Sequence, residues 1–308
     1  MSGYLQLPKE HALAGTSLTI GPIAYGCWRF AGTTVQDAAA KIETALETGF
    51  NLIDTADVYG TTWPDGFGEA EALLGEVINT NKSLRAKMVL ATKGGIVPGL
   101  PYNSTRDYLI SACEASLKRL NTDVIDLYQI HRPDLLAPFE EVAEALNQLL
   151  TAGKIRAAGV SNFTPTQTTA LQKFMSRPLV SHQPEFSCVE TAPITDGILD
   201  QAQEKNMVTF AWSPLAGGQL VSDSVDTAGT TDKVIRLAPV LDRIATENSC
   251  DRSTVALAFL MAHPASVVPI VGTQNLDRIR TSADALTVKM TRRDWYDILE
   301  ASNGAPMP

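Results

Sequence analysis

Residues 50–60 read FNLIDTADVYG, and this stretch is the clearest indication of the fold in the sequence. Its apolar run at 50–53 has the length of a buried strand and ends in the polar residue Asp54. Six further apolar runs, at residues 88–92, 124–130, 155–160, 179–182, 207–211 and 266–271, end in a similar way. They lead into Lys93, His131, Ser161 with Asn162, Gln183, Trp212 with Ser213, and Gly272 with Thr273.

Helical patterns separate these runs. Thr34 with Asp37 predicts a helix start and Gly49 its stop, and Thr164-Pro165 predicts another N-cap. Further helices are expected from 104 or 105 to 120 and at 137–152, 164–175, 194–206, 234–248 and 254–263. Counting residues 23–26 as the first strand gives eight strand–helix units. This repetition predicts an α/β fold, a parallel (β/α)8 TIM barrel, in a single domain spanning residues 1–308.

Two additions to the barrel are expected. Residues 16–19 fit a short N-terminal hairpin that closes the barrel bottom, and residues 292–302 fit an extra C-terminal helix. An open, doubly wound sheet is the main alternative. It is weakened because no G-x-G-x-x-G motif follows the first strand.

Composition excludes several classes of protein. Asp plus Glu number 34 against 25 for Lys plus Arg, a net charge of −9, which argues against a nucleic-acid partner. No apolar run approaches the ~20 residues of a membrane span, and the start lacks a secretion signal, so we expect a cytoplasmic protein. Four scattered cysteines and four histidines without i, i+4 spacing predict neither a disulfide framework nor a metal site.

The ends of the second, third and fourth strands carry the candidate catalytic residues Asp54, Lys93 and His131, and Tyr59 follows Asp54 by five residues. Parallel strands bring their carboxyl ends to one edge, so these side chains should meet. A lysine beside a phenol, whose ordinary pKa is about 10, should lower that pKa by roughly 1–3 units. Tyr59 could then exchange a proton with a carbonyl oxygen that His131 orients.

Each of the four residues also has a structural interpretation. Asp54 could cap its loop, Tyr59 could pack in a turn, Lys93 could lie on the surface, and His131 could be a structural hydrogen-bonding group. Together, at three neighbouring strand ends, they favour a site. A Schiff-base aldolase with Lys93 as nucleophile is a further alternative.

Six motifs in this order resemble those of the aldo-keto reductases: FNLIDTADVYG, MVLATKGGI, DLYQIHRPD, GKIRAAGVSNF, FAWSPLAGG and VVPIVGTQNLDRI. The closing KMTRRDWYDILEAS is similar to the tail of the family's bacterial branch of oxidoreductases. The resemblance covers about residues 18–302. It implies a (β/α)8 barrel that uses NADPH to reduce aldehydes or ketones. It also implies a catalytic tetrad of Asp54, Tyr59, Lys93 and His131, with Tyr59 as proton donor.

The strand ends also offer a cofactor site. Amide and hydroxyl groups suit a carboxamide, an indole suits ring stacking, a small-residue loop suits a pyrophosphate, and an arginine suits a phosphate. The resemblance assigns these roles to NADPH/NADP⁺. We place the contacts at Gly26, Cys27, Trp28, Ser161, Asn162, Gln183, Trp212, Ser213, Leu215, Gly217, Gly272, Thr273, Gln274 and Arg278. Gly272, Thr281 and Ser282 depart from the family pattern, so NADPH is expected over NADH with a weaker preference than usual.

The substrate is expected to be a small carbonyl compound bound by Trp28, Trp63 and His131. The aromatic residues after the first and second strands, Trp28, Phe30 and Trp63, predict a pocket with apolar walls. We expect no partner beyond this small molecule, and a monomer or weak oligomer. An alternative function is a cofactor-binding sensor subunit, because some relatives in the family are channel-associated. The four filled tetrad positions argue against a loss of chemistry.

Overall fold

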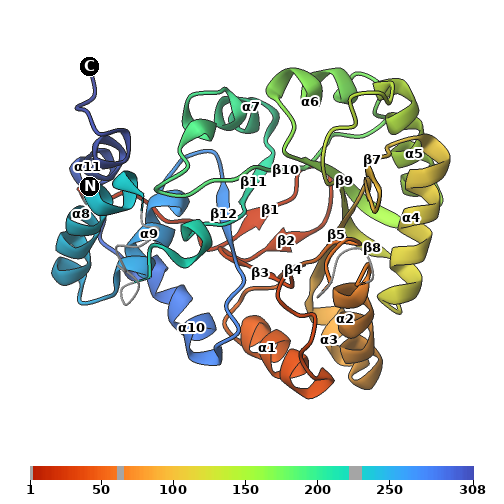
Figure 1. The fold of residues 1–308 in the computed structure, drawn as a ribbon, viewed down its shortest axis with the longest axis horizontal. Coiled ribbons are helices and arrows are strands. Elements are labelled where there is room, and N and C mark those ends of the chain that lie inside the picture. Colours follow the sequence, from red (N-terminus) through yellow and green to blue (C-terminus); the bar gives the residue numbers. More distant parts are fainter. Residues whose placement is uncertain (1–2, 61–65, 222–230) are drawn as a thin grey trace.

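The structure is a computed structural model that describes residues 3–60, 66–221 and 231–308. Within these residues, eight parallel strands close into a barrel, which confirms the predicted fold (Figure 1). The strands are β3 Ala24–Gly26, β4 Leu52–Asp54, β5 Val89–Gly94, β8 Ile125–Ile130, β9 Ile155–Ser161, β10 Ser181–Gln183, β11 Val208–Ala211 and β12 Val267–Val271. Each pairs in parallel with the next, and β12 returns to β3.

The strands read as continuous apolar runs because both of their faces are buried. Along β8, Leu127 belongs to a compact apolar cluster with Leu52 and Ala91 of neighbouring strands. Tyr128 and Ile130 belong to the second cluster, which includes many helix residues. Alternate residues therefore fill the barrel and bind the helices to it.

Helices surround the barrel (Figure 1). They are α1 Val35–Glu47, α2 Glu69–Thr80, α3 Lys82–Lys87, α4 Arg106–Arg119, α5 Phe139–Thr151, α6 Pro165–Gln172, α7 Ile198–Lys205, α8 Asp232–Asn248, α9 Arg252–Met261, α10 Leu276–Thr281 and α11 Arg292–Asn303. None of the described helices has both the length and the apolar character that crossing a membrane requires.

The predicted helix starts are confirmed where a side chain caps them. Thr34 accepts from the Asp37 amide, and Thr164 forms a reciprocal capping box with Gln167 ahead of Pro165. Helix α7 begins at Ile198, later than expected, because a 3₁₀ turn at Ala192–Ile194 precedes it. Helix α2 was not predicted. It starts after Gly68, whose left-handed φ of 83° replaces a side-chain cap.

A two-stranded hairpin closes the bottom of the barrel. Strands β1 (His11–Ala12) and β2 (Thr19–Ile20) pair antiparallel, so the predicted hairpin exists but begins earlier than residues 16–19. Leu13 and Ile20 belong to the apolar cluster inside the barrel. Asn51, just before β4, bonds to Gly21 and Thr19, which fixes the hairpin at the amino ends of the strands.

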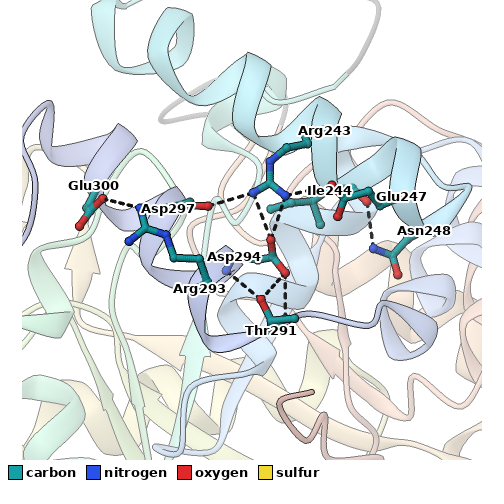
Figure 2. Close-up of polar contacts among 9 residues, drawn as sticks. All are labelled: Arg243, Ile244, Glu247, Asn248, Thr291, Arg293, Asp294, Asp297 and Glu300. Atoms are coloured by element: carbon teal, nitrogen blue, oxygen red, sulfur yellow. Dashed lines mark hydrogen bonds and ion pairs between the residues drawn. The ribbon is translucent and has the colours of Figure 1, made fainter. Parts of the chain in front are cut away.

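The predicted C-terminal helix is present as α11 and packs on α8 (Figure 1). Arg243 of α8 reaches Asp294 and Asp297 of α11, and it also contacts Glu247 on its own helix (Figure 2). Thr291 caps α11 in a reciprocal box with Asp294. We call Arg243, Glu247, Asp294 and Asp297 the surface ion cluster.

A second hairpin, formed by β6 Ile96–Val97 and β7 Leu100–Tyr102, follows β5 and was not predicted. It stands at the carboxyl end of the barrel, where the polar strand ends gather.

Candidate active site

Lys93 lies at the centre of a buried cluster at the carboxyl ends of β4 and β5. Its Nζ is 2.7 Å from Asp54 Oδ2, 2.8 Å from the Thr55 carbonyl oxygen and 3.2 Å from Tyr59 Oη. An ammonium group has three N–H donors, so the three acceptors use all of them. The lysine side chain is fully buried and its geometry is fixed.

Lys93 fixes the orientation of the Tyr59 hydroxyl group, because its ammonium donates a hydrogen bond to the phenol oxygen. No acceptor for the hydroxyl proton is found among the described residues. The ring meets Trp28 edge-on at 5.0 Å and His131 edge-on at 5.7 Å between centroids. The phenolic proton is therefore free to point to a ligand between these rings.

Burial and charge act in opposite directions on this pair. Burial raises the pKa of Tyr59, the Lys93 charge lowers it, and the net shift is upward. The expectation of a lowered phenol pKa is wrong for this structure, because the loss of hydration outweighs the nearby cation. Burial alone would lower the pKa of Lys93, but Asp54 and then Tyr59 raise it above its ordinary value. Near neutral pH the pair is a protonated phenol beside an ammonium.

His131 is electrically neutral in this environment. Burial, followed by the charges of Lys93 and Arg132, holds the pKa of its imidazole well below the usual value. Its Nδ1 is buried and has no hydrogen-bond partner within residues 3–60, 66–221 and 231–308. A neutral imidazole here can orient a carbonyl oxygen by hydrogen bonding, without a charge of its own.

A chain of hydrogen bonds links the site to the next strands. The Gln183 amide nitrogen is 3.1 Å from Asp54 Oδ1, and Ser161 Oγ donates to the Gln183 carbonyl. Asn162 donates to the His131 carbonyl and to Ser161, and it accepts from the Trp212 indole N–H at 3.1 Å. The structure thus brings these predicted cofactor-binding residues together with the tetrad.

The loop after β11 contains the predicted pyrophosphate contacts Ser213, Leu215 and Gly217. Ser213 and Gly217 have positive φ angles of 55° and 68°, and a β-carbon added to Gly217 would meet nothing within 4 Å. Ser213 Oγ accepts from the Gly217 amide at 3.1 Å. The loop is a tight turn with open space above its glycine, although that amide already has an internal partner.

The segment after β12 differs slightly from expectation. Gly272, Thr273 and Gln274 precede the helix, and α10 begins only at Leu276 with Asn275 as its cap. Arg278 is exposed, and its guanidinium makes no hydrogen bond or ion pair with any described residue. Arg280, by contrast, pairs with Asp277 at 3.0 Å.

The first strand brings three predicted residues to the same face. Gly26 pairs with Asp54 in the barrel register, and the Cys27 amide donates to the Asp54 carbonyl at 2.8 Å. The Cys27 side chain is fully buried, so only its backbone could contact a ligand, whereas Trp28 is 66% exposed. Trp63, the other predicted pocket aromatic, lies outside the described residues.

Three features were not singled out from the sequence. Asp57 is fully buried, and neither of its carboxyl oxygens makes a well-formed hydrogen bond with a described residue. Gly94 has no room for a side chain, because an added β-carbon would lie 2.1 Å from Tyr128 Oη. Arg132 follows His131, and its Cζ lies 5.9 Å from the Trp212 ring centroid. None of these has a sequence pattern of its own, since each depends on what surrounds it.

Comparison with known proteins shows the family of the chain. The sequence profile of the Aldo/keto reductase family matches residues 22–303. A 6-dehydroglucose reductase of Novosphingobium aromaticivorans is 46% identical over 303 residues, covering 98% of both chains. A protein of the same name from Agrobacterium fabrum is 40% identical, covering 93% of this chain and 96% of its own.

Among solved structures, the glycerol dehydrogenase of Gluconobacter oxydans superposes with a TM-score of 0.83 at 26% identity. The alignment covers 97% of this chain and 98% of that one. Sequence profile, full-length relatives and barrel geometry agree, and the chain belongs to the aldo/keto reductase family of oxidoreductases, which catalyse carbonyl reduction.

Proposed function

We propose that this protein reduces an aldehyde or ketone to the alcohol with NADPH, and that Tyr59 protonates the carbonyl oxygen. The observation that carries the proposal is the 3.2 Å contact from Lys93 Nζ to Tyr59 Oη. Because the ammonium donates to the phenol oxygen, the phenol can donate only outward, to a substrate. When bound, the cofactor supplies the hydride.

The protein's own groups would divide the remaining work. Lys93 stabilises the negative charge that develops on the phenol oxygen as its proton leaves. Asp54 and the Thr55 carbonyl keep that ammonium in place. Neutral His131, beside the Tyr59 ring, orients the carbonyl oxygen for the proton. In the reverse direction the same phenol oxygen would accept the alcohol proton.

Several described residues fit a dinucleotide. Trp212 offers an indole face held by Asn162, and Gly217 leaves open space above its turn. Arg278, in the first turn of α10, is a cation without an ion-pair partner among the described residues, and it is suited to a phosphate on the adenosine ribose. This supports NADPH over NADH. The resemblance to 6-dehydroglucose reductases supports a sugar-derived carbonyl as the substrate.

Tyr59→Phe tests the chemistry. With 4-nitrobenzaldehyde and NADPH, we expect kcat to fall by roughly 10²–10⁴-fold because general acid catalysis is lost. The dissociation constant of NADPH, measured by fluorescence titration, should change little. Tyr296→Phe, on α11 far from the site, is the matched control and should retain activity. Unchanged turnover by Tyr59→Phe would contradict the proposed role.

Arg278→Gln tests the cofactor. It should weaken NADPH binding more than NADH binding, since only NADPH carries the additional phosphate. Arg280→Gln, two residues away and already paired with Asp277, should leave the ratio of the two dissociation constants unchanged. Equal effects of Arg278→Gln on both cofactors would argue against a phosphate contact.

A further inference from the structure

Arg132 directly follows His131 of the candidate active site, and its guanidinium has no polar partner among the described residues. It makes no hydrogen bond and no ion pair with any residue in the described part of the chain, and its Cζ lies 5.9 Å from the centroid of the Trp212 ring. A partly buried arginine normally has acceptors for its five N–H groups. An unpaired one beside a reaction centre is a candidate ligand-binding group.

Arg132 stands between two open cavities. One, of about 540 Å³, is also bordered by Asn162, Thr164, Glu185 and Asp196. The other, of about 640 Å³, lies against the β6–β7 hairpin and is bordered by Ile96 and Tyr102. The guanidinium therefore borders space large enough for a small molecule on both sides.

Glu185 is the complementary group. It is exposed to solvent, and its carboxylate has no hydrogen-bond or ion-pair partner among the described residues. Burial and the charge of Glu190 raise the pKa of Glu185, and the Arg132 charge lowers it. The Arg132 charge therefore acts on Glu185 without a direct ion pair, and both side chains border the cavity of about 540 Å³.

The mixture of groups selects the ligand chemistry. Arg132 can only donate hydrogen bonds and Glu185 can only accept them, whereas Asn162 and Thr164 already bond within the protein. Hydroxyl groups donate and accept, so a chain of hydroxyls satisfies both charged groups at once. An anionic ligand would meet Glu185 and Asp196 in the same cavity. A purely apolar aldehyde would displace water from the partly buried Arg132 and offer it no acceptor.

The cavity of about 540 Å³ adjoins the tetrad, because Asn162 on its border donates to the His131 carbonyl. Arg132 lies over the Trp212 ring, whose indole N–H bonds to the same Asn162. A substrate whose carbonyl contacts Tyr59 and His131 would place its remaining carbons along these residues to reach Arg132. We propose that Arg132 and Glu185 form a hydroxyl-binding subsite that makes this enzyme selective for neutral, polyhydroxylated aldehydes. This inference rests on the proposed carbonyl reduction and assigns its substrate class.

Three aldehydes distinguish the possibilities: D-glyceraldehyde, 4-nitrobenzaldehyde and 4-carboxybenzaldehyde. Arg132→Met keeps the length of the side chain over Trp212 but removes the charge and the donors. For D-glyceraldehyde we expect kcat/KM to fall roughly 10–100-fold, mostly through KM, as for loss of a charged hydrogen bond. For 4-nitrobenzaldehyde the fall should be much smaller.

Glu185→Gln should weaken D-glyceraldehyde turnover and improve that of 4-carboxybenzaldehyde, because a repelling charge is removed. Arg177→Met, at an exposed arginine just before β10, is the matched control and should change none of the three values. Equal losses for all three aldehydes in Arg132→Met would overturn the subsite and leave the reductase intact. So would a loss confined to 4-carboxybenzaldehyde, which would mark an anion site. Failure of the unmodified enzyme with every aldehyde would refute the proposed function itself.

Discussion

Two ion clusters in this protein are built from the same kinds of side chain but differ in their access to water. In the tetrad, Lys93 and Asp54 have side chains only 0% and 4% exposed. In the surface ion cluster, the Arg243 side chain is 42% exposed and is shared among Glu247, Asp294 and Asp297 (Figure 2). The surface arginine has alternatives for every contact, whereas each Lys93 donor has one acceptor. A mutation in the surface ion cluster should therefore cost little stability, whereas a mutation of Lys93 should cost much more.

Removing Lys93 should have the largest effect. Lys93→Met leaves Asp54 buried without its cation, which typically costs about 3–5 kcal/mol of stability. Reductase activity should also be lost, because the phenol loses its ammonium neighbour. Urea denaturation measures the first effect and NADPH oxidation the second.

The double variant Asp54→Asn with Lys93→Met controls for the stranded charge. It should recover much of the stability, because no unpaired carboxylate remains, but none of the activity. A double variant no more stable than Lys93→Met would show that the pair's electrostatics do not dominate the loss.

Asp57 is a third case, because it is a buried carboxyl without a cation of its own. Burial and then the Glu71 charge raise its pKa well above the usual value, while Arg119, the Val58 amide and Lys93 only partly oppose this. Arg119 is already bound to Glu71 at 2.7 Å. A raised pKa in the folded state means that folding is penalised as pH rises above about 4, where the unfolded carboxyl releases its proton.

Asp57→Asn should therefore stabilise the protein at pH 8, by roughly 1–3 kcal/mol, and make little difference near pH 4. Thermal melts at both pH values measure this. The matched control is Asp126→Asn. This carboxylate is equally buried but is held by Arg85 and Arg156, so its loss should destabilise the fold at pH 8. A gain for Asp57→Asn that is the same at both pH values would argue against a proton-linked cause.

The smallest effect is expected at the surface. Arg243→Ala should cost about 1 kcal/mol or less, because water and salt already screen its three contacts. The cost should shrink further in high salt. Arg236→Ala is a useful comparison, since that side chain donates to the carbonyls of Ala301 and Ser302 at the end of α11. A loss of several kcal/mol for Arg243→Ala would mean that the surface ion cluster is less redundant than its geometry indicates.

Much of this arrangement could be predicted from the sequence because it follows from strand periodicity. Once β4, β5 and β8 are recognised as neighbouring parallel strands, Asp54, Lys93 and His131 must meet at one edge. The pKa shift of Tyr59 could not be predicted in the same way, because its sign depends on how much water the folded loops exclude. The sequence also could not predict that Arg132 lacks a hydrogen-bond partner among the described residues. That depends on which side chains surround it in three dimensions, and residue spacing does not give them.

The errors in the elements have a similar origin. Helices with a capping threonine, such as α1 and α6, were predicted at their first residues, whereas α2 starts from a left-handed glycine and was overlooked. The β6–β7 hairpin is too short for periodicity to reveal. The hairpin at the barrel bottom was predicted, but its start was placed too late, because tertiary contacts such as those of Asn51 define it.

The missing space at Gly94 constrains how this site could be redesigned. Any side chain there would collide with the Tyr128 hydroxyl, and Gly94 directly follows the lysine of the tetrad. A saturation library at position 94 should return glycine almost exclusively, unless position 128 is varied at the same time. Laboratory evolution of new substrates will therefore progress faster through the rim of the pocket than through the strand that carries its lysine.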